Sequence, residues 1–284
     1  LGEPNMGGAD PGELAFFSDG TVVIPITGVN KVAFGKEGDF SMHRVNVGRG
    51  PTTAVASDKL KRAFVANTFD DSISVIDIEG RKISETISLG PQRELQLAER
   101  GEVLFHDGRL SHDGWMTCNT CHTRGHTNGG QNDNFSDKSF GAPKLVLSLL
   151  GAKDTAPYAW NGGTGTLEQQ IRNSNKLTMH GREIDDEQVA ALAAYVKTLE
   201  PPPSVDSLRG TQDEVLVSRG KQLFAARDCA SCHTPPLYTS EDTYDVGLHD
   251  KQGNTNFNPP SLRGVGQRGP YFHDASAKRL EDVF

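Results

Sequence analysis

Two short motifs in the chain combine a pair of cysteines with a histidine at a fixed spacing. They are Cys118-Asn119-Thr120-Cys121-His122 and Cys229-Ala230-Ser231-Cys232-His233. In C-x-x-C-H the two thiols bond to the vinyl groups of a porphyrin, and the histidine is the proximal ligand of the iron. All four cysteines of the chain lie in these motifs, so none is left for a disulfide. The sequence therefore predicts two covalently bound haem c groups, ligated by His122 and His233.

Other uses of a C-x-x-C pair are less consistent with this pattern. The pair alone also occurs in zinc sites and in dithiol redox centres. A histidine directly after the second cysteine, in both motifs, disfavours these two alternatives.

The bulk composition limits the partners and the location. At 284 residues the chain is expected to contain more than one domain. Its net charge of -8 argues against nucleic acid or an anionic membrane as a partner.

No run of about 18 apolar residues is present, so no transmembrane segment is expected. The start, Leu1-Gly2-Glu3-Pro4, is not a signal peptide. Because haem c is normally attached outside the cytoplasm, we expect a periplasmic or extracellular protein whose targeting sequence was removed or is missing.

The first part of the chain, residues 1–91, has the pattern of strands and turns. Apolar or alternating runs cover Thr21–Ile26, Arg62–Ala66 and Ser72–Ile78. Turn residues recur at a period of about 40, which is typical of β-propeller blades with four strands each. We therefore expect a fragment of a β-propeller with about two blades, and a small separate β-sandwich is the alternative. Since a propeller closes with more blades, the chain is expected to begin inside a longer protein.

Helices are expected on both sides of the first motif. A helix within Arg93–His106 leads into it. A second helix covers residues 185–199, where Asp185 and Gln188 can form a capping box. The apolar stripe of this second helix is Val189, Leu192, Val196 and Leu199. Between the two helices, the polar, glycine-rich residues 123–166 are expected to wrap a porphyrin.

An internal repeat relates the two haem regions. Arg100–Phe105 parallels Arg219–Phe224, and Ser148–Glu168 matches Ser261–Glu281 without a gap at an offset of 113 residues. The predicted architecture is therefore multidomain: an all-β region (1–91) is followed by two mainly α-helical cytochrome c-type domains, a first haem region (92–203) and a second haem region (204–284). In this repeat Trp160 occupies the position that His273 has in the second copy.

The second copy stops before the first one does. Everything equivalent to residues 172–199 is absent after Phe284. The second haem is therefore expected to lack its closing helix, because the chain is incomplete or its tail is disordered. Its distal ligand is expected beyond Phe284, with His249, sixteen residues after His233, as the candidate within the chain.

The segments Thr155–Gly162 and Pro260–Asp274, together with the tandem C-x-x-C-H motifs, resemble the bacterial dihaem cytochrome c peroxidase and MauG superfamily. The resemblance covers about residues 93–284. Some relatives carry an N-terminal propeller of the YVTN type, which Phe64–Asn67 and Ser72–Asp77 also resemble.

This resemblance implies a function and a set of partners. Hydrogen peroxide would be reduced, or used to oxidise a partner protein, at the first haem, with electrons passed through the second. Trp160 would lie on the electron route, and His273 would form hydrogen bonds near a haem propionate or between the domains. A small cytochrome, a cupredoxin-type donor or a protein substrate would be the partner, and an inter-domain calcium ion is typical of the family. The alternative is an electron-transfer cytochrome without catalysis, with the propeller as a docking module.

One part of the family pattern is missing. The peroxidases carry a distal glutamate in a Pro-x-Glu-Met pattern, whereas this chain has Lys176-Leu177-Thr178-Met179-His180-Gly181. Peroxide cleavage needs a group that moves a proton between the two oxygens. We expect His180 to serve there or to ligate the iron, with Glu183 as a weaker candidate. Met179 is expected in the core, and His126 on a solvated loop.

Overall fold

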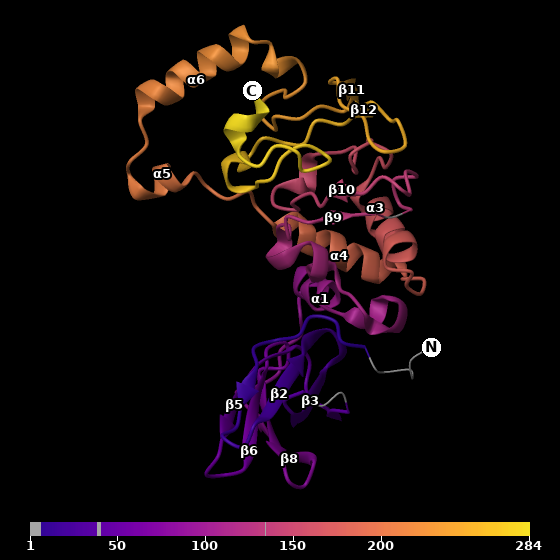
Figure 1. Ribbon diagram of the computed structural model, residues 1–284, viewed down its shortest axis with the longest axis vertical. Helices are drawn as coiled ribbons and strands as arrows, with labels where there is room; N and C mark the ends of the chain where they lie inside the picture. Colours follow the sequence, from indigo (N-terminus) through magenta and orange to yellow (C-terminus); the bar gives the residue numbers. More distant parts are fainter. Residues whose placement is uncertain (1–6, 39–40, 134) are drawn as a thin grey trace. The chain divides into compact units, whose positions relative to one another are not determined.

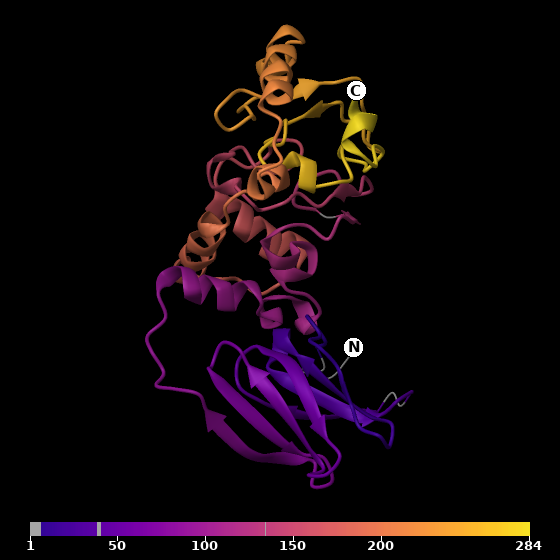
Figure 2. The same cartoon turned by 90° about the vertical axis from the view of Figure 1, so that its left-hand side faces the viewer.

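The computed structural model describes residues 7–38, 41–133 and 135–284, so the N-terminal stretch Leu1–Pro4 lies outside the described residues. The chain divides into two compact units. Unit 1 contains Leu1–Thr120 and Met179–Arg182; unit 2 contains Cys121–Thr178 and Glu183–Phe284. The course of the chain through both units can be followed in Figure 1 and, turned by a quarter, in Figure 2.

The β region of unit 1 consists of two four-stranded antiparallel sheets, each with its strands in chain order. The first contains β1 (Ala15–Phe16), β2 (Thr21–Ile26), β3 (Lys31–Lys36) and β4 (His43–Asn46). The second contains β5 (Pro51–Ser57), β6 (Arg62–Asn67), β7 (Ser72–Asp77) and β8 (Lys82–Ser88). The predicted all-β region is thus present, and each of its two sheets has the four strands expected of one blade. The two described sheets do not close into a ring, and their assignment as propeller blades remains a prediction.

One apolar core joins the two sheets. Val23, Val32 and Phe34 contribute to it from the first sheet, and Val65 and Ile76 from the second. Successive side chains of a strand point to opposite faces, and Val32 and Phe34 are two residues apart, with Val23 as the cross-strand partner of Phe34, so these three share one face of the first sheet. Burial of this shared face therefore explains the period-two pattern of β6, where Ala63 and Val65 are buried.

A buried amide lies inside the second sheet. Asn67, 1% exposed, ends β6 and donates through Nδ2 to the hydroxyl oxygens of Ser72 at 3.0 Å and Ser74 at 2.9 Å. Both serines lie on the adjacent strand β7, where Ser72 is the direct partner of Asn67.

Two helices precede or contain the first haem motif. Helix α1 (Leu97–Phe105) begins with a capping box between Gln96 and Glu99 and buries Phe105. It lies within the predicted range Arg93–His106. Helix α2 (Cys118–Cys121) is a single turn that contains both cysteines of the motif.

In unit 2, helices α3 (Leu167–Asn173) and α4 (Asp186–Thr198) pack together. The predicted capping box of α4 is present: the Asp185 carboxylate accepts from the backbone N–H of Gln188 at 2.8 Å, and the Gln188 side chain accepts from the Asp185 N–H at 3.1 Å. Three residues of the predicted apolar stripe, Val189, Leu192 and Val196, are buried, whereas the fourth, Leu199, is the partly buried C-cap of α4.

The second haem region contains less buried regular structure. It has α5 (Val205–Arg209), α6 (Glu214–Ala226), β11 (Tyr244–Asp245) and β12 (Asn256–Phe257). Helix α6 buries none of its residues, and Val215 and Leu216 are 77% and 63% exposed. In both cartoon views α6 lies at the periphery of unit 2 (Figures 1 and 2).

The backbone confirms the internal repeat. Gly151 and Gly264 both adopt positive φ, 77° and 70°, and each precedes a short 3-10 helix. Tyr158 pairs with Thr164, and at the same offset Tyr271 pairs with Ala277. A non-glycine residue follows each tyrosine with positive φ, Ala159 at 69° and Phe272 at 65°. Since backbone angles agree as well as residue types, the two segments are structural copies.

Among the helices of the described residues, none combines the length and the apolar character needed to cross a bilayer.

Candidate haem sites

One turn of chain presents both cysteines in each motif. Cys118 and Cys121 are the first and last residues of α2, whereas Cys229 begins a 3-10 turn (Cys229–Ser231) that Cys232 follows. All four cysteines are outside disulfides and partly exposed. Burial raises the pKa of the Cys121 thiol. The motifs thus keep their thiols available for thioether formation at one porphyrin edge.

The two motif histidines are held in the same way. Nδ1 of His122 lies 2.9 Å from the carbonyl oxygen of Leu147, and Nδ1 of His233 lies 3.0 Å from that of Tyr238. Because a carbonyl oxygen only accepts, each Nδ1 must carry the proton and donate it. Each Nε2 is then left with its lone pair, as a metal-bound imidazole requires.

Burial lowers the pKa of both histidines, against the effect of these hydrogen bonds. The neutral form, which is the ligating form, is therefore favoured. Two thiols and an oriented neutral imidazole in each motif fit haem c and its iron.

The first motif is also fixed to the start of the β region. One oxygen of Asp10 accepts hydrogen bonds from Thr117 at 2.8 Å and Asn119 at 3.2 Å, and lies 3.3 Å from Nδ1 of His106. Burial opposes ionisation of this carboxyl, but the hydrogen bonds outweigh it and lower the pKa of Asp10. An ionised carboxylate thus holds residues on both sides of Cys118.

Trp160 lies where the first and second haem regions meet. Its indole Nε1–H donates to the carbonyl of Leu145 at 2.7 Å, and its own carbonyl accepts from the backbone N–H of Asn258 at 2.7 Å. The ring centroid is 6.3 Å from that of His273, with the planes at 73°. The two residues that occupy matching positions in the repeat are therefore neighbours in space.

His273 is almost completely buried, with 2% of its surface exposed. Its ring stacks on Phe257 with centroids 4.3 Å apart, and its carbonyl accepts from the N–H of Leu145 at 2.6 Å. Burial lowers its pKa, which favours the neutral ring. Its predicted role toward a haem propionate remains a prediction.

A buried ion cluster that no sequence motif predicts occupies the same junction. Nζ of Lys144 lies 3.0 Å from Oδ2 of Asp137 and 3.0 Å from Oδ2 of Asp250. Lys144 belongs to β10 (Lys144–Leu145), which pairs with β9 (Gln131–Asn132). A lysine next to the apolar run Leu145-Val146-Leu147 is the only signal in the sequence that could have indicated it.

The predicted distal residues lie in different environments. His180 is exposed and adopts φ 48°, Met179 is buried and Glu183 is exposed. The burial of Met179 agrees with its expected place in the core. His180 as a distal group remains a prediction.

His126 and His249 lie outside the two motifs, and both form hydrogen bonds. His126 engages both ring nitrogens, Nδ1 with Ser148 Oγ at 2.7 Å and Nε2 with the Gln267 carbonyl at 3.3 Å. It is therefore a partly exposed loop residue that also bridges the first and second haem regions. His249 has an exposed side chain and forms a backbone hydrogen bond to His273, and its role as an iron ligand remains a prediction.

The carbonyls of Leu147 and Tyr238 could not have been found from the sequence, because any residue type supplies a carbonyl. Their position follows from the path of the loops after each motif.

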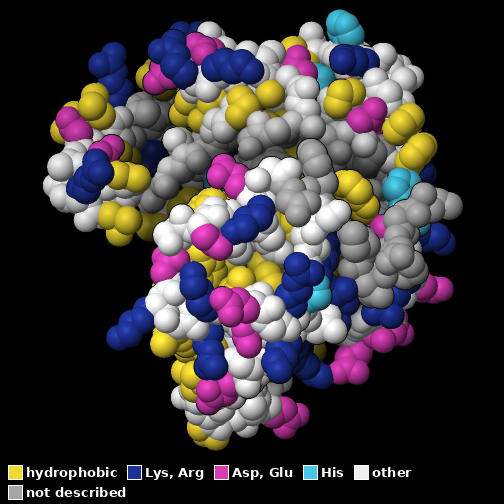
Figure 3. Space-filling view, turned by 60° about the horizontal axis from the view of Figure 1, so that its bottom comes forward, with side chains coloured by type: hydrophobic (Ala, Val, Ile, Leu, Met, Phe, Trp, Pro, Cys, Tyr) yellow, Lys and Arg dark blue, Asp and Glu magenta, His cyan; other side chains and the backbone are white. Residues whose placement is uncertain are grey.

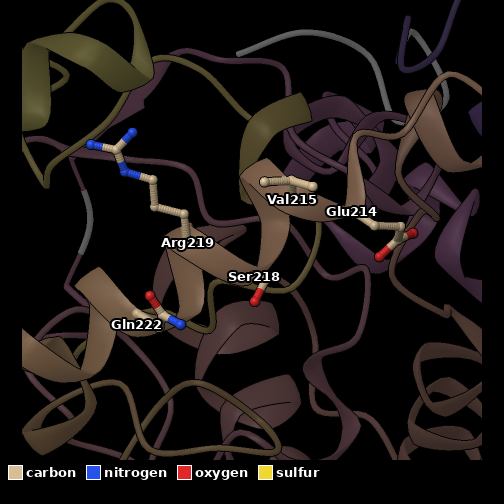
Figure 4. A pocket seen from close by; sticks show the side chains of 5 residues that line it. All are labelled: Glu214, Val215, Ser218, Arg219 and Gln222. Atoms are coloured by element: carbon tan, nitrogen blue, oxygen red, sulfur yellow. The ribbon is translucent and has the colours of Figure 1, made fainter.

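The surface outside these sites offers two further observations. An open pocket is lined along α6 by Glu214, Val215, Ser218, Arg219 and Gln222 (Figure 4). It contains neither motif histidine. On the face shown in Figure 3, acidic and basic side chains are interspersed.

Family models match both haem regions. Residues 96–201 match the di-haem cytochrome c peroxidase model, and residues 217–282 match the cytochrome c model. The chain is 24% identical over 238 residues to the methylamine utilization protein MauG of Methylophilus methylotrophus, covering 66% of this chain and 71% of that protein. It is 26% identical over 245 residues to the cytochrome c551 peroxidase of Nitrosomonas europaea, covering 66% and 71%.

A solved structure shares the fold. A chain of the hydrazine synthase of Kuenenia stuttgartiensis superposes with a TM-score of 0.56 at 20% sequence identity, covering 71% of this chain and 89% of that one.

Proposed function

This chain belongs to the superfamily of di-haem cytochrome c peroxidases and MauG proteins, and from that premise we propose that it is an extracytoplasmic oxidoreductase that reacts with hydrogen peroxide. It would reduce peroxide, or use it to oxidise a partner protein, at the first haem. Electrons would come from a small cytochrome or a cupredoxin-type donor through the second haem.

The observation that carries this proposal is the position of Trp160. Its ring neighbours His273 at the junction of the two haem regions, and its Nε1–H is fixed by the Leu145 carbonyl. A partly buried indole, held in one orientation between two redox regions, is a suitable relay for electrons.

The residues of the chain have separable tasks in this proposal. When bound, haem iron supplies one-electron chemistry and a coordination position for a small oxidant. His122 and His233 hold the two groups, and the Leu147 and Tyr238 carbonyls keep each Nδ1 protonated. His180 would move a proton between the two oxygens of peroxide.

The decisive experiment is optical and EPR spectroscopy of the half-reduced, haem-loaded protein, followed by addition of peroxide. We expect a high-spin signal from one haem, rapid reaction with peroxide, and two haem masses attached to the polypeptide by mass spectrometry. Two low-spin haems and no peroxide reaction would instead identify the alternative, an electron-transfer cytochrome with an N-terminal docking module. An unmodified polypeptide would contradict both.

The type of oxidation needs a separate assay. Turnover of peroxide with a reduced small cytochrome would place the chain with the peroxidases, whereas oxidation of a protein side chain without that donor would place it with the MauG proteins.

A further inference from the structure

The buried ion cluster at the junction joins one haem region to the other. Asp137 and Lys144 belong to the first haem region, and Asp250 to the second. The side chains of Asp137, Lys144 and Asp250 are 12%, 5% and 2% exposed. Two carboxylates from different regions thus share one ammonium group away from solvent.

The cluster is fully supplied with hydrogen bonds. Lys144 also donates to the Ser139 hydroxyl and, at 3.3 Å, to the Ala142 carbonyl. These four oxygens around Nζ exceed the three protons of an ammonium group, so the cation is well enclosed.

Asp250 is held equally firmly. Its Oδ1 accepts from the backbone N–H groups of Gln252 at 2.9 Å and Asn254 at 3.0 Å, and its Oδ2 accepts from Asn254 Nδ2 at 2.9 Å. Burial opposes its ionisation, but the donors, Lys144 among them, outweigh this and lower the pKa of Asp250 to about 2. The carboxylate is therefore charged and needs a cation beside it.

Carboxylate and carbonyl oxygens, which surround this point, are also the ligand types of Ca²⁺. Here the Lys144 ammonium occupies that point. Among the residues that the structure describes, no group of three or more His, Cys, Asp or Glu side chains is arranged to hold a metal ion. Because the Lys144 ammonium fills the space between the two carboxylates, the inter-domain calcium that the family resemblance implies does not fit between them.

We propose that Lys144 is a built-in cation, which takes at this junction the structural part that a bound calcium ion would play. The neighbouring residue Leu145 carries the hydrogen bonds to both Trp160 and His273. Lys144 is thus a positioning residue, since it fixes the strand on which that pair depends. This proposal does not rest on the peroxide chemistry, because it concerns the cation requirement of the folded protein.

The test uses the haem-loaded chain and measures melting temperature and calcium binding by calorimetry. The wild type should bind no calcium at the junction, and its melting temperature should be the same in EGTA and in millimolar Ca²⁺. Lys144→Ser removes the ammonium but leaves the four oxygens. We expect it to melt roughly 10 °C lower, to bind Ca²⁺ and to recover part of the loss when calcium is added.

Two further variants distinguish the effect of the lost charge from the effect of the lost side-chain volume. Lys144→Met keeps the length of the side chain and should be destabilised without any rescue by calcium. Lys197→Met removes a matched lysine whose ion pair with Glu168 is about half exposed, and should melt close to the wild type.

Three results would overturn the proposal. The first is a wild type whose melting temperature falls in EGTA. The second is a Lys144→Ser protein that neither binds calcium nor is stabilised by it. The third is a Lys144→Met protein with the same melting temperature as Lys197→Met. The first does not depend on any variant folding.

Discussion

The rings of Trp160 and His273, 113 residues apart in the chain and at matching positions of a repeat, meet edge to face with centroids 6.3 Å apart. One strand residue serves both: the carbonyl of Leu145 accepts from the Trp160 indole, and its N–H donates to the His273 carbonyl. Duplicated domains that face each other bring equivalent residues together, and this pair is the result.

Trp160→Phe should therefore slow electron exchange between the haems by orders of magnitude while the fold and both haem spectra persist. Phenylalanine keeps the aromatic bulk but lacks the N–H and is harder to oxidise. Flash photolysis or stopped-flow reduction would measure the exchange. Trp115→Phe is the control, since Trp115 is 74% exposed. Unchanged exchange in a folded Trp160→Phe protein would leave Trp160 with a packing role alone.

His180→Gln should lower the rate of the peroxide reaction by roughly 10²- to 10⁴-fold, the usual contribution of one general acid–base group. If His180 is instead an iron ligand, the same change should convert a low-spin haem to high spin. Stopped-flow kinetics and EPR distinguish the two roles. His112→Gln, at a residue that is 67% exposed, should change neither reading. A His180→Gln protein equal to wild type in both would remove His180 from the site.

Asp10→Asn should destabilise unit 1 by about 1–3 kcal/mol, because it disturbs a buried acceptor of hydrogen bonds from Thr117 and Asn119. Urea unfolding at neutral pH measures the loss. Asp58→Asn is the control, because the hydrogen bonds that the Asp58 carboxylate accepts from Ser18 are exposed to solvent. An Asp10→Asn protein as stable as the control would show that the carboxylate is dispensable.

The same residue predicts a pH dependence. The folded pKa of Asp10 is lowered below its ordinary value of 3.8, so its contribution is complete above about pH 4 and is lost as the pH falls through the folded pKa. The stability difference between wild type and Asp10→Asn should therefore be constant between pH 5 and 7 and shrink in stronger acid. A difference that stays constant down to pH 2 would contradict this assignment.

Asp185→Ala should lower the stability of the first haem region by about 1 kcal/mol, because it removes the N-cap of α4. Thermal unfolding would measure it. Asp185→Asn keeps a capping oxygen and should restore most of the loss. If the two variants have the same melting temperature, the side-chain cap does not contribute to the stability of α4.

The sequence allowed good predictions wherever a local pattern decides the structure. The strand Thr21–Ile26, the cap at Asp185 and the buried stripe of α4 follow from periodicity and capping chemistry. The motif residues were found because thiol and imidazole at fixed spacing have few other uses. The offset of 113 residues predicted the matching backbones at Tyr158 and Tyr271.

Other features depend on contacts that no local pattern encodes. The Leu147 and Tyr238 carbonyls are indistinguishable in sequence from any others. The ion pair between Lys144 and Asp250 joins residues more than a hundred positions apart, and strands β1, β4, β5 and β8 carry weaker apolar patterns than their neighbours.

The amide of Asn67 has a consequence for how the second sheet forms. Its Nδ2 needs the hydroxyls of Ser72 and Ser74, and the residue between them on β7 is Ile73. If the hairpin of β6 and β7 paired one residue out of step, isoleucine would face the amide and leave its N–H groups unsatisfied in the core. This one polar side chain therefore favours the native register of the hairpin over a register shifted by one residue.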